Sequence, residues 1–135
     1  MAKLSRRIAI ALLVVIGMLT ASPSITAFHS SGITALYGVV LENNAALLLV
    51  RHRQIILGLL GATLICGAFF DSLRMMAITV NVLSKSVFLA LSLTTSTLTP
   101  GLQQIVYFDV VSIVLLLISA FIFLQLIFQS RRKST

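Results

Sequence analysis

Apolar residues are arranged along the chain in four long runs separated by short polar segments. The runs cover residues 8–28, 45–70, 75–93 and 103–128. Each is close to or above the roughly 20 residues that a helix needs to cross the hydrocarbon core of a bilayer. Open strand edges do not persist in lipid, so runs of this kind form helices. The pattern predicts an all-α integral membrane protein, a four-helix transmembrane bundle in which residues 1–135 form one domain.

The polar segments predict how the runs are connected. Residues 29–44 are rich in glycine and asparagine and indicate a connection that carries a short interfacial helix or turn. Tyr37 in this connection is expected at the level of the lipid head groups. Residues 71–74 predict a tight hydrophilic turn, and residues 94–101 a polar loop that ends in a Pro-Gly pair.

The first run also fits a cleavable signal peptide, because a basic segment precedes it and small residues follow it. For a cleavage site after Ala27, however, Ile25 would stand three residues before the cut, where it is a poor signal. Pro23 lies near the outer end of the run, where a kink is tolerated. We therefore favour an uncleaved first helix, with a cleaved leader as the alternative.

Composition agrees with a membrane protein. Hydrophobic residues make up 59% of the chain and charged residues 10%, and the mean hydropathy is +1.11. Soluble domains have about 45–50% apolar and about 25% charged residues. The difference excludes an ordinary cytosolic enzyme and a disordered tail.

The charge is strongly positive, with ten Lys and Arg against three acidic residues and a net charge of +7. In a soluble protein this excess would suggest nucleic acid as a partner. Here the basic residues flank the apolar runs, so membrane topology explains them better and no nucleic-acid partner is expected. With both termini in the cytoplasm, seven of the ten basic residues lie on the cytoplasmic side: Lys3, Arg6, Arg7, Arg74, Arg131, Arg132 and Lys133. The positive-inside rule thus predicts a multi-pass protein of the bacterial inner membrane with cytoplasmic termini.

Ionisable residues interrupt three of the runs. Such a side chain costs about 2.5–3.5 kcal/mol within a membrane, so it usually faces the bundle interior and finds a partner. At a rise of about 1.5 Å per residue, Arg51 and Arg53 lie roughly 9–12 Å and Asp109 about 9 Å from the outer ends of their helices. Lys85 lies about 15 Å into the third helix, near the midplane. These depths predict a shared polar cluster in which Asp109 offsets Lys85 or Arg51, with Glu42 approaching from the outer loop.

Helical phase separates the two arginines. Arg51 shares a stripe with Gln54 and with small residues that allow close helix contact (Gly58, Gly61 and Ala62), so it is expected in the interior. Arg53 shares a stripe with leucines (Leu57, Leu60 and Leu64), so it is expected to face lipid and to extend outward, with His52 between the two faces. Two further faces are polar and are expected to pack together: Asn81, Ser84, Lys85, Phe88 and Ser92 on the third helix, and Asp109, Ser112 and Ser119 on the fourth.

Simpler interpretations exist for each of these residues. The second helix could begin at Gln54, which would place residues 51–53 among the head groups as an interfacial anchor. Lys85 and Asp109 could form a structural ion pair that fixes helix register. His52 could be a hydrogen-bonded structural residue.

Motifs of known chemistry are absent from the sequence. It contains no Walker loop, no GxGxxG, no HExxH and no GxSxG motif. Cys66 is the single cysteine, which excludes an intramolecular disulfide and a Cys-rich metal site. An enzyme is therefore unsupported, and no catalytic residue and no metal site are predicted.

Four stretches carry a resemblance to a known family: LYG at 36–38, ENNAALLLVRHRQIILGLLG at 42–61, GAFFDSLR at 67–74 and YFDVVSIVLLL at 107–117. Together they resemble small bacterial four-helix membrane proteins of the DoxX-like family over about residues 8–128. The resemblance implies that Arg51, His52, Arg53 and Asp109 are the family's shared positions. DoxX is associated with a membrane thiosulfate-to-quinone oxidoreductase, so quinone is the one cofactor that the resemblance allows, and otherwise no cofactor is expected. Lys85 departs from the pattern, in which an apolar residue is more usual.

Three functions are compatible with these features. The leading prediction is a non-enzymatic accessory subunit, or a binder of a lipid or small molecule, with the polar cluster Arg51, His52, Arg53, Lys85 and Asp109 as its site. The second is a quinone-linked redox subunit in which Arg51 and His52 donate to a carbonyl oxygen. The third is a proton-coupled transporter that uses Lys85 and Asp109 and dimerises, because four helices are few for alternating access. Expected partners are the lipid bilayer and either another membrane protein or a second copy.

Overall fold

The computed structural model describes residues 2–132, and the regular elements in this part of the chain are all helices, without strands. In chain order the elements are α1 (Ala2–Ala21), a 3-10 helix η1 (Ser22–Thr26), α2 (Ser30–Tyr37), α3 (Asn44–Phe69), α4 (Asp71–Leu93) and α5 (Pro100–Arg132). The predicted all-α class is confirmed for these residues.

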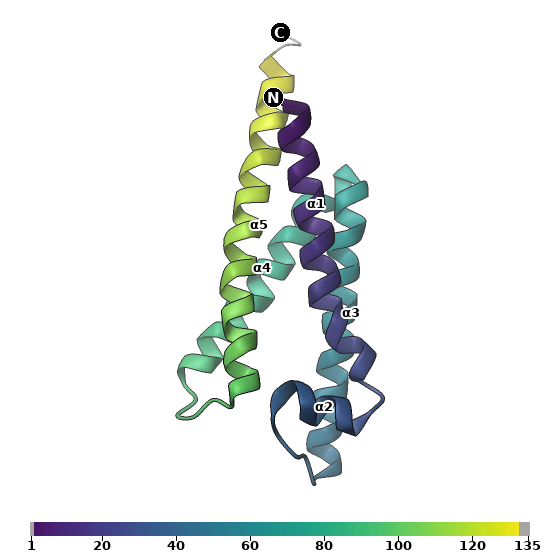
Figure 1. Cartoon of the computed structure of the whole chain (residues 1–135). Helices are drawn as coiled ribbons and strands as arrows, with labels where there is room; N and C mark the ends of the chain where they lie inside the picture. The colour runs from purple at the N-terminus through teal and green to yellow at the C-terminus, as the bar shows by residue number, and fades with distance from the viewer. Residues whose placement is uncertain (1, 133–135) are drawn as a thin grey trace.

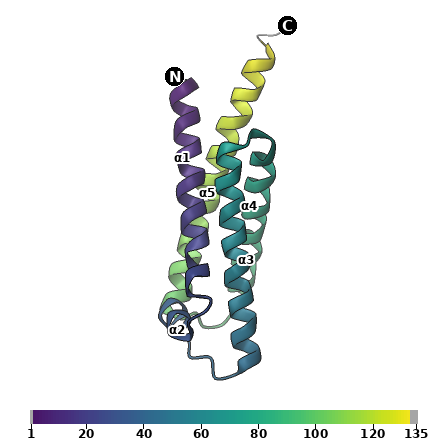
Figure 2. The ribbon, with the colours of Figure 1, turned by 90° about the vertical axis from the view of Figure 1, so that its right-hand side faces the viewer.

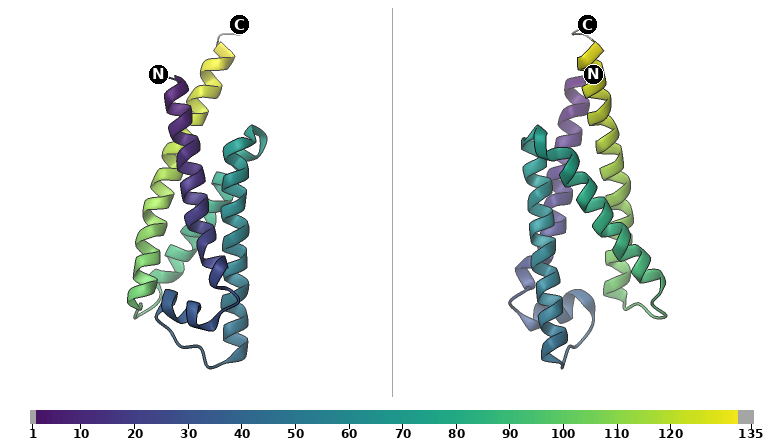
Figure 3. Two further views of the ribbon diagram at one scale, coloured as in Figure 1. Left: turned by 45° about the vertical axis from the view of Figure 1, so that its right-hand side comes forward. Right: turned by 180° about the vertical axis from the view of Figure 1, so that it is seen from behind.

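The four long helices form a bundle in which α1 packs against α3 and α5, and α4 packs against the same two helices (Figure 1). The first and last described residues lie at one end, and the turn between α3 and α4 lies on the same side (Figure 2). We call this the terminal end. The opposite end, which we call the loop end, carries α2 and the connection from α4 to α5. Toward the loop end α4 diverges from α3 and approaches the start of α5 (Figure 3).

Four helices are long and apolar enough to cross a membrane: Lys3–Thr26, Asn44–Phe69, Asp71–Leu93 and Pro100–Gln129. They correspond to the four predicted spans, with two differences at the ends. Residues 71–74 are the first turn of α4 rather than a separate turn, because Phe70 alone separates α3 from α4. The predicted loop at 94–101 is shorter, because α5 begins at Pro100, and proline is tolerated in the first turn of a helix.

The first span is not one continuous α-helix. It changes to the 3-10 helix η1 after Ala21, with Pro23 among the first residues of η1. The hydroxyls of Ser22, Ser24 and Thr26 each donate to a carbonyl three residues earlier, at 2.9, 2.7 and 2.9 Å. These bonds favour the tighter winding, because serine and threonine hydroxyls compete with the backbone for nearby carbonyls.

Glycines bring α1 and α3 into close contact. A Cβ atom at Gly61 would lie 2.3 Å from the carbonyl oxygen of Gly17 and 2.7 Å from the Cβ of Ala21. A Cβ atom at Gly58 would lie 2.8 Å from the Cβ of Ser24. The predicted contact face is thus confirmed at Gly58 and Gly61, whereas Ala62 is exposed.

The apolar core lies in the half of the bundle nearer the terminal end. It is formed by Ala9, Leu13, Ile16, Leu64, Ala68, Ala77, Ile78, Leu116 and Phe123. On α3 and α4 these residues belong to the half nearer the terminal end, whereas on α1 and α5 they extend to the middle of the helix. The ion pair and the two cavities beside it, described below, lie nearer the loop end.

The short helix α2 confirms the predicted helical connection. It ends at Gly38, which has a φ of 67° in the left-handed region that favours glycine. The hydroxyl of Thr99 donates to the carbonyl of Tyr37 at 2.6 Å, and a Cβ atom at Gly101 would lie 2.5 Å from the carbonyl oxygen of Leu36. Because α2 is held against the start of α5 in this way, the Tyr37 side chain is buried.

Candidate functional site

An ion pair between Lys85 on α4 and Asp109 on α5 lies at the centre of the polar half of the bundle. The lysine Nζ contacts Oδ1 of the aspartate, and the two side chains are only 5% and 9% exposed. The ring of Phe108 lies 4.7 Å from the lysine Nζ, a distance that permits a cation–π contact. Of the two predicted partners for Asp109, Lys85 is the one that the structure shows.

The predicted polar faces of α4 and α5 point inward. Asn81, Lys85 and Ser92 are buried on α4, and Asp109, Ser112 and Ser119 on α5. The Asn81 amide donates to the carbonyls of Leu60 and Ala77 at 3.1 and 3.0 Å. Asn81 therefore joins α4 to α3, about one helical turn nearer the terminal end than Lys85, which joins α4 to α5.

Arg53 is half-buried and contacts aromatic rings of α2 and α4, which corrects the prediction that it faces lipid. Its guanidinium carbon is 4.4 Å from the ring centroid of Phe88 and 5.8 Å from that of Tyr37. Leu64, on the same stripe of α3, is fully buried. On this stripe Leu64 packs against Gly17 of α1, and Arg53 contacts aromatic rings of α2 and α4. Helical phase does not reveal these tertiary contacts.

Arg51, His52 and Glu42 do not join the ion pair. Arg51 is half-buried and lines neither cavity beside the pair, while His52 and Glu42 are exposed. The stripe that contains Arg51 packs against η1 instead, where the fully buried Gln54 donates to the Thr26 hydroxyl at 2.9 Å. The predicted cluster of five residues is thus reduced to Arg53, Lys85 and Asp109.

The alternative in which the second helix begins at Gln54 is wrong. Helix α3 begins at Asn44, well before these residues. The side chain of Asn43 caps the helix by accepting a hydrogen bond from the Ala45 amide at 2.8 Å.

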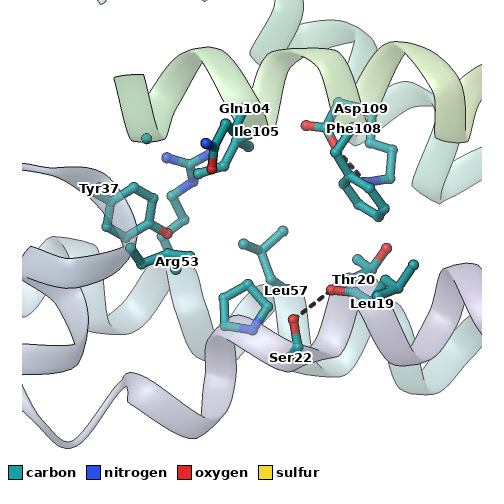
Figure 4. Close-up of a pocket in the computed structure, with 14 residues that line it drawn as sticks. Leu19, Thr20, Ser22, Tyr37, Arg53, Leu57, Gln104, Ile105, Phe108 and Asp109 are labelled. Carbon is teal, nitrogen blue, oxygen red and sulfur yellow. Dashed lines mark hydrogen bonds and ion pairs between the residues drawn. The ribbon is translucent and has the colours of Figure 1, made fainter. Parts of the chain in front are cut away.

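Two cavities adjoin the ion pair. The first, of about 230 Å³, lies among α1, η1, α2, α3, α5 and Lys85 of α4, and its apolar lining includes Leu19, Ile105 and Phe108 (Figure 4). The second, of about 440 Å³, lies among α3, α4 and α5, where α4 diverges. Four side chains line both cavities: Arg53, Leu57, Lys85 and Asp109. These four residues form a common wall.

Two hydroxyls add polarity to the first cavity. The Thr20 side chain is 3% exposed, and its oxygen has no hydrogen-bond partner in the described part of the chain. Burial raises the pKa of Tyr37 above its ordinary value of 10.0, while Arg53 and Gln54 oppose this rise. The phenol therefore keeps its proton at physiological pH. Sequence analysis missed Thr20, whose only signal was a hydroxyl inside an apolar run.

The acidic residues leave Arg53 without a counter-charge. Asp71 pairs with Arg6 and Arg74 at the terminal end, and Asp109 pairs with Lys85. Glu42, the third acidic residue of the sequence, is exposed in the connection before α3. Within residues 2–132, no carboxylate forms an ion pair with Arg53. The first cavity therefore has a fixed positive charge at one side.

The donor set does not form a metal centre. Within the described residues, no three His, Cys, Asp or Glu side chains lie close enough to hold a metal ion together. Among the polar groups that line the two cavities, basic and hydroxyl side chains outnumber the single carboxylate of Asp109. Such groups suit an anion or a carbonyl oxygen rather than a cation.

No protein-family model, no curated protein and no solved structure matches the chain. The resemblance to the DoxX-like family therefore gains no support from these comparisons.

Proposed function

We propose that the chain is a non-enzymatic integral membrane protein that binds an amphiphile with an acidic head group in the cavity beside Arg53. The observation that carries this proposal is a half-buried guanidinium without a carboxylate partner at the edge of an apolar cavity. An unpaired charge within a membrane span is costly, and a bound anion would offset that cost. Arginine also suits this role because its planar fork binds carboxylates and phosphates through two parallel hydrogen bonds.

The cavity walls favour an apolar body attached to the acidic group. Leu19, Leu57 and Ile105 line the first cavity along with the ring of Phe108. Lys85 and Asp109 neutralise one another, so the common wall adds polarity without an additional net charge. A ligand that carried only a charge would leave the apolar walls unused.

The second cavity supplies a route for the ligand. It lies where α4 diverges from α3, and it is lined by Val87 and Leu91 of α4 as well as by Arg53. In a bilayer, an acyl chain could enter between these two helices while its head group reaches Arg53. With cytoplasmic termini, the loop end and its cavities would lie in the outer half of the inner membrane.

A test uses the full chain purified in a mild detergent. An alkaline carbonate wash of the membranes should first leave the protein in the pellet, since release would contradict membrane insertion. Thermal unfolding is then measured with oleate and with oleyl alcohol, which share a tail and differ in charge. Oleate at about 100 times its Kd should stabilise the protein by about 2.7 kcal/mol, and the alcohol should not.

A matched pair of variants tests whether Arg53 binds the acidic head group. Arg53→Gln should abolish the stabilisation by oleate, whereas Arg51→Gln, two residues away on the same helix and outside both cavities, should retain it. Equal stabilisation by acid and alcohol, or an undiminished response of Arg53→Gln, would overturn the proposal.

Quinone binding is a second candidate, favoured by the buried Thr20 hydroxyl, which could donate to a carbonyl oxygen. Arg51 and His52, the donors expected from sequence, line neither cavity. This candidate predicts that decylubiquinone stabilises the protein, that Thr20→Val abolishes the effect, and that quinone co-purifies. A proton-coupled transporter is a third, because Lys85 and Asp109 line both cavities, and it predicts a dimer in mild detergent.

A further inference from the structure

The terminal end carries a third cavity, far along the bundle from Arg53. It has a volume of about 380 Å³ and lies among the first turns of α1 and α4 and the last third of α5. Lys3 and Arg6 of α1 and Asp71 and Arg74 of α4 supply its polar groups. Phe123, Leu126 and Ile127 of α5 supply an apolar wall.

Arg74 is fixed at the base of this cavity. Its side chain is 8% exposed and donates to the carbonyls of Gly67 and Ala68 at 2.9 and 3.1 Å, near the C-terminus of α3. Its guanidinium carbon lies 4.2 Å from the ring centroid of Phe123, and an ion pair of 2.5 Å joins it to Asp71. The charge of Arg74 is thus largely satisfied within the protein.

The outer part of the cavity keeps an excess of positive charge. Asp71 is the single carboxylate in the lining, against the three cations Lys3, Arg6 and Arg74. The ion pair between Arg6 and Asp71 is 3.4 Å long, with side chains 53% and 67% exposed. Exposed pairs of this kind are weak, so Arg6 can bind another anion at little cost.

The position of the cavity matches the depth of lipid head groups. The candidate spans of α1 and α4 begin at Lys3 and Asp71, and that of α5 ends at Gln129. The basic groups therefore lie at the edge of the spans, while Phe123 and Leu126 extend the cavity toward the hydrocarbon. Basic pockets between helices at the cytoplasmic surface are typical sites for anionic head groups.

From this combination we infer that the terminal-end cavity binds an anionic membrane lipid, with its phosphate held between Lys3 and Arg6 and an acyl chain against Phe123 and Leu126. The inference shares with the proposed function only the placement of the chain in a bilayer. It concerns different residues at the opposite end of the bundle.

The experiment measures lipid binding to the full chain by native mass spectrometry from mild detergent. Phosphatidylglycerol and phosphatidylcholine with identical acyl chains are added in turn, and phosphatidylglycerol should bind preferentially. Arg6→Gln should weaken its binding roughly fivefold, the effect of one basic residue near a membrane surface. Arg7→Gln is the matched control, because Arg7 is the next residue, is exposed and lies outside the cavity.

The Asp71→Asn variant distinguishes electrostatic attraction of the lipid from the structural effect of losing the contact between Arg6 and Asp71. It breaks the same contact with Arg6 but removes a negative charge from the cavity, so it should strengthen the binding of phosphatidylglycerol. If Arg6→Gln and Asp71→Asn both weaken binding, the cavity is not an electrostatic site and the inference fails. It also fails if both lipids bind equally, or if Arg7→Gln weakens binding as much as Arg6→Gln.

Two additional measurements test whether the bound phosphate belongs to a lipid and whether the terminal-end cavity binds independently of the cavity beside Arg53. Millimolar inorganic phosphate should not displace the lipid, and efficient displacement would show that the cavity binds the free anion instead. Arg53→Gln should leave the lipid bound, while Arg6→Gln should leave the oleate response intact. A loss of lipid in Arg53→Gln would assign the lipid to the loop-end cavity and overturn the inference.

Discussion

Lys85 and Asp109 join α4 to α5 through a buried ion pair between two helices that are apolar enough to span a membrane. Both side chains are at most 9% exposed, so water solvates neither charge fully. Each charge therefore offsets the desolvation cost of the other, and the pair sets the relative position of the two helices beside the cavities.

Substitution of one partner should be much more harmful than substitution of both. Lys85→Met or Asp109→Leu alone leaves an uncompensated buried charge and should lower the free energy of unfolding by about 3–5 kcal/mol. The double variant removes both charges and should be close to the original protein in stability. Unfolding in mild detergent with increasing SDS measures the three values.

The double variant is the control for this cycle, because it changes the same volume as the two single variants together. A double variant as unstable as the sum of the single ones would show that the side chains act independently. Such a result would contradict the compensation that the geometry indicates.

The contact between α1 and α3 depends on the absence of a side chain at Gly61. Gly61→Val should destabilise the bundle by about 1–3 kcal/mol, because its Cβ would lie 2.3 Å from the Gly17 carbonyl oxygen. Ala62→Val, at the neighbouring exposed position, should have little effect on the same SDS unfolding curve. Similar losses in both variants would mean that valine is harmful anywhere on this part of α3.

The four helices could be predicted because the length and polarity of the apolar runs leave few alternatives in lipid. The ends of the helices were harder to predict from the sequence. Asp71 and Arg74 read as a hydrophilic turn, yet they begin α4, because Arg74 caps the last carbonyls of α3 and allows a connection of one residue. That capping interaction depends on tertiary geometry that no local pattern encodes.

The candidate site was also predicted only in part, because part of it depends on tertiary contacts. The pairing of Lys85 with Asp109 followed from depth and helical phase, which are local properties of α4 and α5. The assignment of Arg51 to the interior and Arg53 to lipid was reversed with respect to the cavities, because Arg53 contacts the rings of Tyr37 on α2 and Phe88 on α4. The position of α2 depends on contacts such as that of Thr99 with Tyr37, across a long separation in sequence.

Arg74 should stabilise the connection between α3 and α4 through its planar fork rather than through its charge alone. Arg74→Met removes hydrogen bonds from a charged donor to two carbonyls, and we expect a loss of about 1.5–3 kcal/mol or more. Arg74→Lys keeps the charge but has one donor group, so it should recover only part of this loss. Chemical unfolding in detergent measures both variants.

The exposed Arg6 offers a comparison for this prediction. Its ion pair with Asp71 is exposed, so Arg6→Gln should cost less than about 1 kcal/mol. If Arg6→Gln were as harmful as Arg74→Met, the terminal end would depend on its surface charges rather than on the cap formed by Arg74.

The two ends of the bundle should lie on opposite sides of the membrane, with the loop end outside. Residues 29–44 and 94–99 contain no lysine or arginine, whereas Lys3, Arg6, Arg7 and Arg74 belong to the terminal end. The positive-inside rule thus favours cytoplasmic termini. In a Cys66→Ser background, Glu42→Cys should react with a membrane-impermeant maleimide in intact cells. Ser72→Cys, at the exposed start of α4, should react only after the cells are permeabilised.

The two positions control for one another, because both are exposed and differ in the end of the bundle at which they lie. The reverse labelling pattern would place the termini outside, and the cavity beside Arg53 would then face the cytoplasmic leaflet. Labelling of both positions in intact cells would show that the four helices do not all cross the membrane. The acidic amphiphile proposed for the loop end must reach its site from the outer leaflet if the first pattern is found, since the second cavity opens in that half of the bundle.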